Sequence, residues 1–205
     1  MVYATDPTQV LATATLNNEQ ILFKNVHLSL FQDMFGYGWF LKFPFIIGEN
    51  NTLDVELTNT SASSNEVSIK LLGWDSLTLD AFERWLVDRG QSMFTPSFLY
   101  ISQTTILAGA TRQQLTAEMR PYPVRITRMF MGSDNLSMLR VGIGLINREV
   151  QQDTFPELLN AEFRHRAINI PLRLGIRDPL YLYVTNTDTL NTYNVSFLAE
   201  VYSDG

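Results

Sequence analysis

The chain has 205 residues, of which 45% are hydrophobic and 12% aromatic, enough for one sizeable core. All-β domains commonly reach about 200–250 residues, so length alone does not divide the chain. Charged residues make up 18% of the chain and the net charge is −6. Surfaces that bind nucleic acid or anionic membranes need clustered Lys and Arg, so this balance argues against both partners.

The chain contains no cysteine, which excludes disulfides, thiolate metal sites and cysteine nucleophiles. The first ten residues, MVYATDPTQV, lack the basic start and apolar stretch of a secretion signal. No apolar run approaches the ~20 residues that span a bilayer. We therefore expect a protein made in a reducing cytoplasm. Residues 1–8 are predicted to form a flexible N-terminal arm, and residues 9–205 a single β-sandwich domain.

Two strands are predicted within residues 10–30, and they precede an unusual aromatic segment. Residues 35–40 read FGYGWF, so aromatic residues alternate with glycine. In a strand, Phe35, Tyr37 and Trp39 share one face, and glycine in a strand often marks a bulge or the close approach of another backbone. Two interpretations stay open. One is a core strand that curves around the sandwich edge, and the other is an aromatic face that binds a sugar or a neighbouring subunit.

Two stretches of the chain share a sequence pattern. Residues 44–72 alternate apolar and polar side chains on both sides of a polar loop, which predicts a β-hairpin. Residues 171–201 resemble a second copy, because Pro, Gly, Leu and a Thr-Asn-Thr triplet recur at an offset of 127 residues (171 minus 44). Six of the seventeen positions from 44 to 60 are identical. Either the two hairpins match by coincidence, or the chain carries a pseudo-repeat.

The remaining elements point to a mainly β protein. One helix is predicted over residues 79–88, and a second short helix is expected to begin near Pro156. The strand over residues 139–145 places Gly142 and Gly144 opposite its apolar face, which leaves space for a close neighbour. About ten short strands without strand–helix–strand alternation predict an antiparallel β-sandwich of jelly-roll type with one or two short helices.

The strand over residues 124–130 is predicted to alternate without interruption. Under that reading, Val124, Ile126 and Phe130 share the apolar face, and Arg125 lies on the other face.

No catalytic or metal-binding pattern stands out in the sequence. There is no P-loop, no HExxH pair, no nucleophile elbow and no calcium loop. Two histidines, His27 and His165, are too few for a histidine metal site without carboxylates. Hydrolase acids would have to come from residues such as Asp54, Glu56 or Asp153, and the sequence places no second group beside any of them. We therefore predict no enzyme, and no catalytic, cofactor or metal site.

Arginine and lysine are distributed unequally along the chain. Ten arginines from Arg112 onward lie in the second half, whereas the three lysines lie in the first half. Arginine is enriched at protein interfaces because its planar fork makes paired hydrogen bonds and stacks on rings. Either a head-to-tail contact between unlike surfaces or a local drift in composition explains this asymmetry. The candidate interface residues are Phe35, Tyr37, Trp39, Arg125, Arg128, Arg164 and Arg166.

A cysteine-free β-sandwich with low charge, polar loops and a free arm resembles the structural proteins of virus particles. The resemblance is to tailed-bacteriophage proteins of the capsid decoration, collar or ring type. It is one of general style over the whole chain and depends on no motif. It implies a homo-oligomeric virion protein without cofactors, whose partners are copies of itself and other virion proteins. The alternative is a carbohydrate-binding β-sandwich whose aromatic residues stack on a glycan.

Overall fold

The fold is mainly β, as the sequence predicts, and its sheets are antiparallel. The computed structural model describes residues 2–17, 20–31, 52–70, 96–117, 120–146, 148–156 and 172–203. The predictions for residues 35–40, 79–88 and 157–165 lie outside this part of the chain. The complete helices among the described residues are short 3-10 turns, labelled η1 to η3, and Pro156 is the one further described residue in helical conformation.

The described residues of the C-terminal half form eight strands. They are β6 (Pro96–Ile106), β7 (Gln113–Thr116), β8 (Val124–Ser133), β9 (Leu139–Leu145), β10 (Arg148–Thr154), β11 (Leu172–Leu174), β12 (Tyr181–Asn186) and β13 (Tyr193–Ser203). One sheet has the order β11-β8-β13-β6 and the other has the order β10-β9-β12-β7. The chain crosses between the sheets at every connection except β9–β10. This arrangement is a jelly roll, which confirms the predicted fold class.

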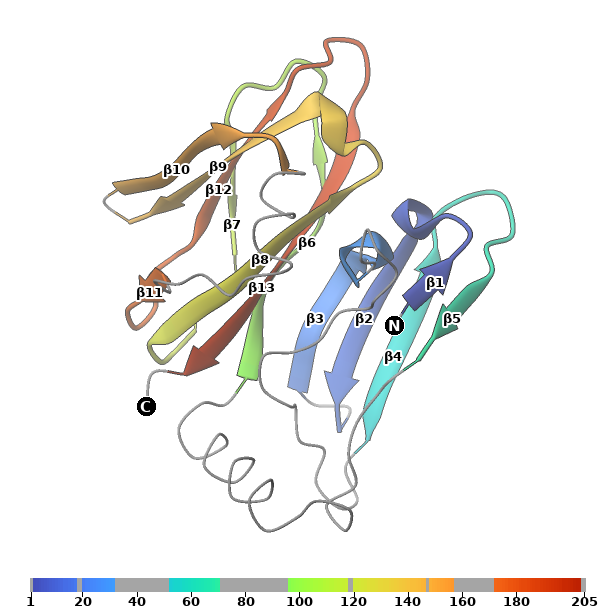
Figure 1. The fold of residues 1–205 in the computed structure, drawn as a ribbon, viewed down its shortest axis with the longest axis horizontal. Coiled ribbons are helices and arrows are strands. Elements are labelled where there is room, and N and C mark those ends of the chain that lie inside the picture. Colours follow the sequence, from blue (N-terminus) through green and yellow to red (C-terminus); the bar gives the residue numbers. More distant parts are fainter. Residues whose placement is uncertain are drawn as a thin grey trace.

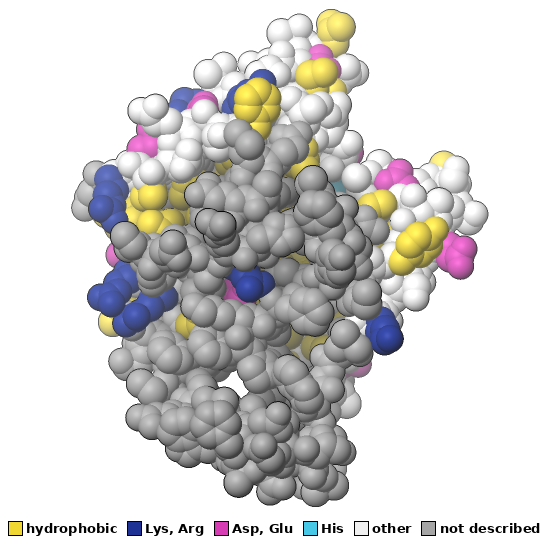
Figure 2. Space-filling view, in the orientation of Figure 1, with side chains coloured by type: hydrophobic (Ala, Val, Ile, Leu, Met, Phe, Trp, Pro, Cys, Tyr) yellow, Lys and Arg dark blue, Asp and Glu magenta, His cyan; other side chains and the backbone are white. Residues whose placement is uncertain are grey.

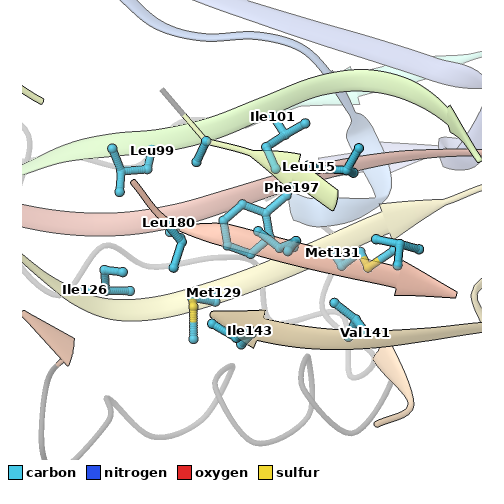
Figure 3. Packing of buried hydrophobic residues seen from close by; sticks show 14 of the residues in the cluster. Leu99, Ile101, Leu115, Ile126, Met129, Met131, Val141, Ile143, Leu180 and Phe197 are labelled. Carbon is cyan, nitrogen blue, oxygen red and sulfur yellow. The ribbon is translucent and has the colours of Figure 1, made fainter. Parts of the chain in front are cut away.

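The first core lies between these two sheets (Figure 3). Alternation along β9 and β12 turns Val141 and Ile143 inward, together with Leu182. Phe197 and Met129 face them from the other sheet. Each fully buried side chain of this size stabilises the fold by roughly 1.5–3 kcal/mol relative to exposure.

The N-terminal half forms a second, smaller set of strands. Its elements are β1 (Val2–Ala4), η1 (Pro7–Gln9), β2 (Val10–Leu16), β3 (Gln20–His27), η2 (Leu28–Phe31), β4 (Leu53–Asn59) and β5 (Val67–Ile69). One sheet has the order β3-β2-β4, and β1 pairs with β5. Figure 1 shows these strands beside the outer face of the β11-β8-β13-β6 sheet. Phe98, Phe130 and Leu198 of that sheet join the second core, so the sheet is buried on both faces.

Residues 2–8, which belong to the predicted arm of residues 1–8, lie against the domain. Val2 and Ala4 pair with β5, and the Thr5 amide donates to the carbonyl of Glu66 at 3.1 Å. The Asp6 amide donates to Asn65 Oδ1 at 3.0 Å. Val2 and Ala4 also pack on the second core, which gives this segment an apolar reason to stay attached.

Neither of the two predicted hairpins is a hairpin, although strands occupy the predicted positions. In the first stretch, β4 pairs with β2 and β5 pairs with β1. In the second stretch, β12 pairs with β9 and β7, and β13 pairs with β6 and β8. Each polar loop therefore joins strands of two different sheets.

The two loops nevertheless share their hydrogen bonds. Asn59 Oδ1 accepts from the amide two residues later at 3.1 Å, and Asn186 Oδ1 does the same at 3.0 Å. Thr60 donates its amide and its hydroxyl to the carbonyl of Gln9, at 2.8 and 2.9 Å. Thr187 donates the same two groups to the carbonyl of Met138, at 2.9 and 2.8 Å.

The correspondence extends to the strands around these loops. Gln9 ends η1 immediately before β2, and Met138 ends η3 (Leu136–Met138) immediately before β9. Val10 lies opposite the Asn of the first loop, as Leu139 lies opposite the Asn of the second. In addition, β3 pairs with β2 as β10 pairs with β9, and β1 pairs with β5 as β8 pairs with β13. Five N-terminal strands thus repeat the arrangement of five strands of the jelly roll.

The prediction of uninterrupted alternation along β8 is wrong. Arg128 lies opposite Glu200, but Ile126 lies opposite the next residue of β13, so one residue of β8 has no counterpart. This β-bulge reverses the alternation. Met129 therefore faces the first core with Ile126, whereas Phe130 faces the second core.

Candidate functional site

Two of the predicted interface residues lie in the described part of the chain. Arg125 and Arg128 are half-buried on β8. The β-bulge between them brings both onto the outer face of the β11-β8-β13-β6 sheet. The other predicted interface residues, Phe35, Tyr37, Trp39, Arg164 and Arg166, lie outside the described residues. The role of all seven as an interface stays a prediction.

Arg128 makes an ion pair inside the chain. Its Nε lies 3.6 Å from Glu200 Oε2, and the Glu200 side chain is fully buried while that of Arg128 is 15% exposed. The Tyr202 hydroxyl donates to the other oxygen of Glu200. Removing one partner of a buried ion pair leaves an uncompensated charge. Arg128 therefore supports the fold from the same position at which it was predicted to bind a partner.

A buried histidine and serine join the two halves of the molecule. The Ser196 hydroxyl of β13 lies 2.7 Å from His27 Nδ1, and the same oxygen accepts from the His27 amide at 2.8 Å. The Ser196 oxygen is thus hydrogen-bonded to both the backbone and the ring of His27. Burial lowers the pKa of His27 to about 4, and the carboxylate of Asp134 opposes this shift. The ring is therefore neutral at pH 7.

This pair does not form a hydrolytic site. His27 and Ser196 are both fully buried, so the hydroxyl is not open to a substrate. Asp134 acts on His27 through its charge, and its side chain bonds elsewhere, accepting from the Asn194 amide at 2.9 Å. A triad needs a third group that orients the imidazole, together with access to the nucleophile. The pair instead fixes β3 against β13.

The outer face of the β10-β9-β12-β7 sheet carries a cluster of charged and aromatic side chains that the sequence predicted only in part. A Cβ on Gly144 would lie 2.7 Å from the Tyr183 ring, and one on Gly142 would lie 2.7 Å from Asp153 Oδ1. The space that the two glycines leave is therefore filled by side chains of neighbouring strands. The spacing of Gly142 and Gly144 was the available signal for this contact.

Arg112, which the sequence did not single out, holds this cluster together. Its guanidinium donates to Asp153 at 2.6 Å and to Glu149 at 2.8 Å, and lies 4.8 Å from the Tyr183 ring centroid. The hydrogen bond to Glu149 raises the pKa of Arg112 above its usual value. Arg112 has a φ of 50°, and its amide donates to Thr185 Oγ1 at 3.0 Å. No sequence pattern marks an arginine in this left-handed conformation.

The three acids considered for a hydrolase do not share a site. Asp54 and Glu56 are exposed on β4 in the three-stranded sheet, whereas Asp153 lies on β10 and is paired with Arg112. Glycoside hydrolysis needs two carboxyl groups that face each other across the bond to be cleaved. Among the described residues, no group of three or more His, Cys, Asp or Glu side chains is placed to hold a metal ion. Within the same ranges, no helix has the length and apolar character needed to cross a membrane.

Comparisons with known proteins add little to this geometry. No protein-family description matches the chain, and no curated protein matches it. A solved structure that matches is that of the major capsid protein P2 from bacteriophage PM2. The identity is 9%, the match covers 98% of this chain and 85% of that chain, and the TM-score is 0.45. A match this weak carries no argument about this chain.

Proposed function

We propose that this chain is a non-enzymatic structural component of a virus particle. The observation that carries the proposal is the strand order of the two C-terminal sheets, because the eight-stranded jelly roll is an architecture that viral capsid proteins use. Lectin domains and cupins use it as well, so fold alone supports the proposal only in part. Further support comes from polar side chains that bind one another and are not free to act on a substrate.

Two groups of polar side chains that could serve in catalysis are instead engaged with one another. His27 and Ser196 are closed inside the protein, and the Arg112 guanidinium is occupied by two carboxylates. Side chains engaged in this way stabilise the fold. The mechanism we propose is therefore contact area and symmetry between many copies, which together supply affinity.

The finer proposal is a capsid decoration, collar or ring protein that assembles head to tail. Basic side chains appear mainly over the C-terminal half of the face shown in Figure 2, whereas acidic and apolar side chains are exposed on both halves. Unlike surfaces on one molecule favour heterologous contacts, which close into rings or shells. The partners are copies of the same chain and neighbouring virion proteins, and the location is the virion.

Light scattering on the purified chain, followed by negative-stain imaging of the same fraction, tests this proposal. Rings, capsomers or shells are the expected result. The double variant Tyr37→Ala, Trp39→Ala should weaken assembly without lowering the melting temperature. A variant that assembles normally but melts earlier would show that these rings belong to a core. A chain that stays monomeric over a wide concentration range, alone and with other virion proteins, would contradict the proposal.

Glycan binding is the second candidate, and one observation favours it. Tyr181 and Tyr183 lie on the outer face of the β10-β9-β12-β7 sheet, with ring centroids 6.4 Å apart and an interplanar angle of 32°. Paired tyrosines on an open sheet face suit stacking on a sugar. However, the Arg112 guanidinium already covers the Tyr183 ring. Titration with common polysaccharides, with Tyr181→Ala as the control variant, separates the two functions, since flat binding curves remove this one.

A further inference from the structure

The apolar face of β4 is far more exposed than the same face of its counterpart β12. Val55 and Leu57 are each 39% exposed. At the offset of 127 residues they correspond to Leu182 and Val184, which are 1% and 0% exposed. Both pairs occupy equivalent register positions, beside β2 and β9 respectively. Pairing with β2 or β9 therefore does not explain the difference in exposure. The difference comes from the other neighbours of β4 and β12.

In the C-terminal half, β7 covers β12. It pairs with the edge of β12 that faces away from β9, and Leu115 of β7 lies opposite Leu182. In the same way, β6 pairs with β13. Among the described residues of the N-terminal half, no strand takes the place of β7 beside β4 or of β6 beside β5.

We propose that β4 binds an extended segment of another polypeptide chain as an added antiparallel strand. The binding position is the edge of β4 that faces away from β2, called the β4 edge below. An edge strand presents unpaired N–H and C=O groups that a further strand can satisfy. Such a strand would lie beside β4 as β7 lies beside β12, and would cover Val55 and Leu57. Main-chain hydrogen bonds then give affinity, and alternate side chains give specificity.

The charges on β4 define the chemistry of the incoming segment. Asp54 and Glu56 alternate with the two apolar residues and are exposed. Like charges directly opposite each other destabilise a strand pair, so β4 of a second copy is a poor partner. The segment should carry an apolar residue opposite Val55 and neutral or basic residues opposite the acids. The strand β7 has this pattern, with Gln114 opposite Tyr183, the counterpart of Glu56.

The test uses a synthetic peptide of residues 96–117, which carries β6 and β7, as the probe for the full chain. Amide hydrogen exchange is followed by mass spectrometry with the peptide at millimolar concentration. Exchange in residues 53–59 should slow by about tenfold, because new backbone hydrogen bonds form on the β4 edge. Exchange in residues 139–145, whose strand already has two neighbours, should not change.

Two matched controls make the result specific. The same peptide with Leu115→Asp should give no protection, and the chain variant Val55→Asp should lose the effect while Ile176→Asp, at a residue that is 63% exposed, keeps it. Equal protection by both peptides, or none by either, would overturn the proposal. So would β4 amides that exchange as slowly as those of β12 before any peptide is added, because the edge would then be covered within the chain. None of these outcomes depends on whether the chain is part of a virion.

Discussion

Five strands of each half share the same arrangement, but their side chains are buried to different degrees. In the C-terminal half, Leu182 and Val184 of β12 are closed between two complete sheets. In the N-terminal half, Val55 and Leu57 hold the same register positions but remain partly in contact with solvent. The register of the strands and the geometry of the loops are therefore the same in the two halves, although β4 is less buried than β12. The stability of such a molecule should be distributed unequally, and that inequality can be measured.

The largest expected difference comes from truncating equivalent core positions. Leu182→Ala removes a fully buried side chain and should reduce the free energy of unfolding by about 2–5 kcal/mol. Val55→Ala removes fewer atoms from a half-open site and should cost less than about 1 kcal/mol. Urea unfolding of both variants measures the contrast. Equal losses would mean that β4 is as well covered in solution as β12.

The junction between the halves should respond to acid through His27. Burial lowers its folded pKa to about 4, whereas the unfolded chain binds the proton near 6.5. The unfolded state binds more protons in this window, so stability is full above pH 6.5 and falls as the pH drops towards 4, by up to about 3 kcal/mol. Unfolding curves at several pH values, compared with those of His27→Gln, test this. An unchanged pH slope in the variant would assign the effect to other groups.

The same junction should be sensitive to a single methyl group. A Cβ on Gly132 would lie 3.0 Å from His27 Cβ and 3.0 Å from Leu30 Cγ. Gly132→Ala therefore forces β8 away from the N-terminal half and should cost about 1–3 kcal/mol. Hydrogen exchange should rise in β3 more than in β12. A uniform change across both halves would argue against a local clash.

The smallest expected effects lie in the two matching loops. Thr60→Val and Thr187→Val each remove one hydroxyl that donates to a backbone carbonyl, of Gln9 and Met138 respectively. Each change should cost about 0.5–1.5 kcal/mol, and the two costs should agree within a few tenths. Thermal unfolding of both variants compares them directly. A neutral change in one loop and a costly one in the other would show that the equivalence is geometric only.

Sequence patterns located most of the strands but not their neighbours. Alternation in residues 53–58 and 180–185 predicted strands where β4 and β12 lie, because a pleated strand turns alternate side chains to one face. The same alternation cannot say which strand lies alongside, and proximity in the chain favoured hairpins. The Thr-Asn-Thr triplets have a specific structural role that alternation does not predict. Their side chains tie a loop that crosses between sheets to the start of a third strand.

The candidate site residues were predictable to a lesser degree. Gly142 and Gly144 signalled a close neighbour, and the structure supplies Tyr183 and Asp153. Arg112 carried no signal, since its role depends on a left-handed backbone and on acids from β10. The reversal of alternation on β8 was equally hidden, because a bulge depends on the register of the partner strand.

The position of β13 has a consequence for how the protein is made. This strand lies between β8 and β6, which are both synthesised before it, in the four-stranded sheet that both cores share. The two earlier strands cannot join through their common neighbour until it leaves the ribosome. Assembly of the shared sheet thus depends on contacts between distant parts of the chain, which slows folding. We expect the facing edges of β6 and β8 to stay unpaired until β13 has been synthesised.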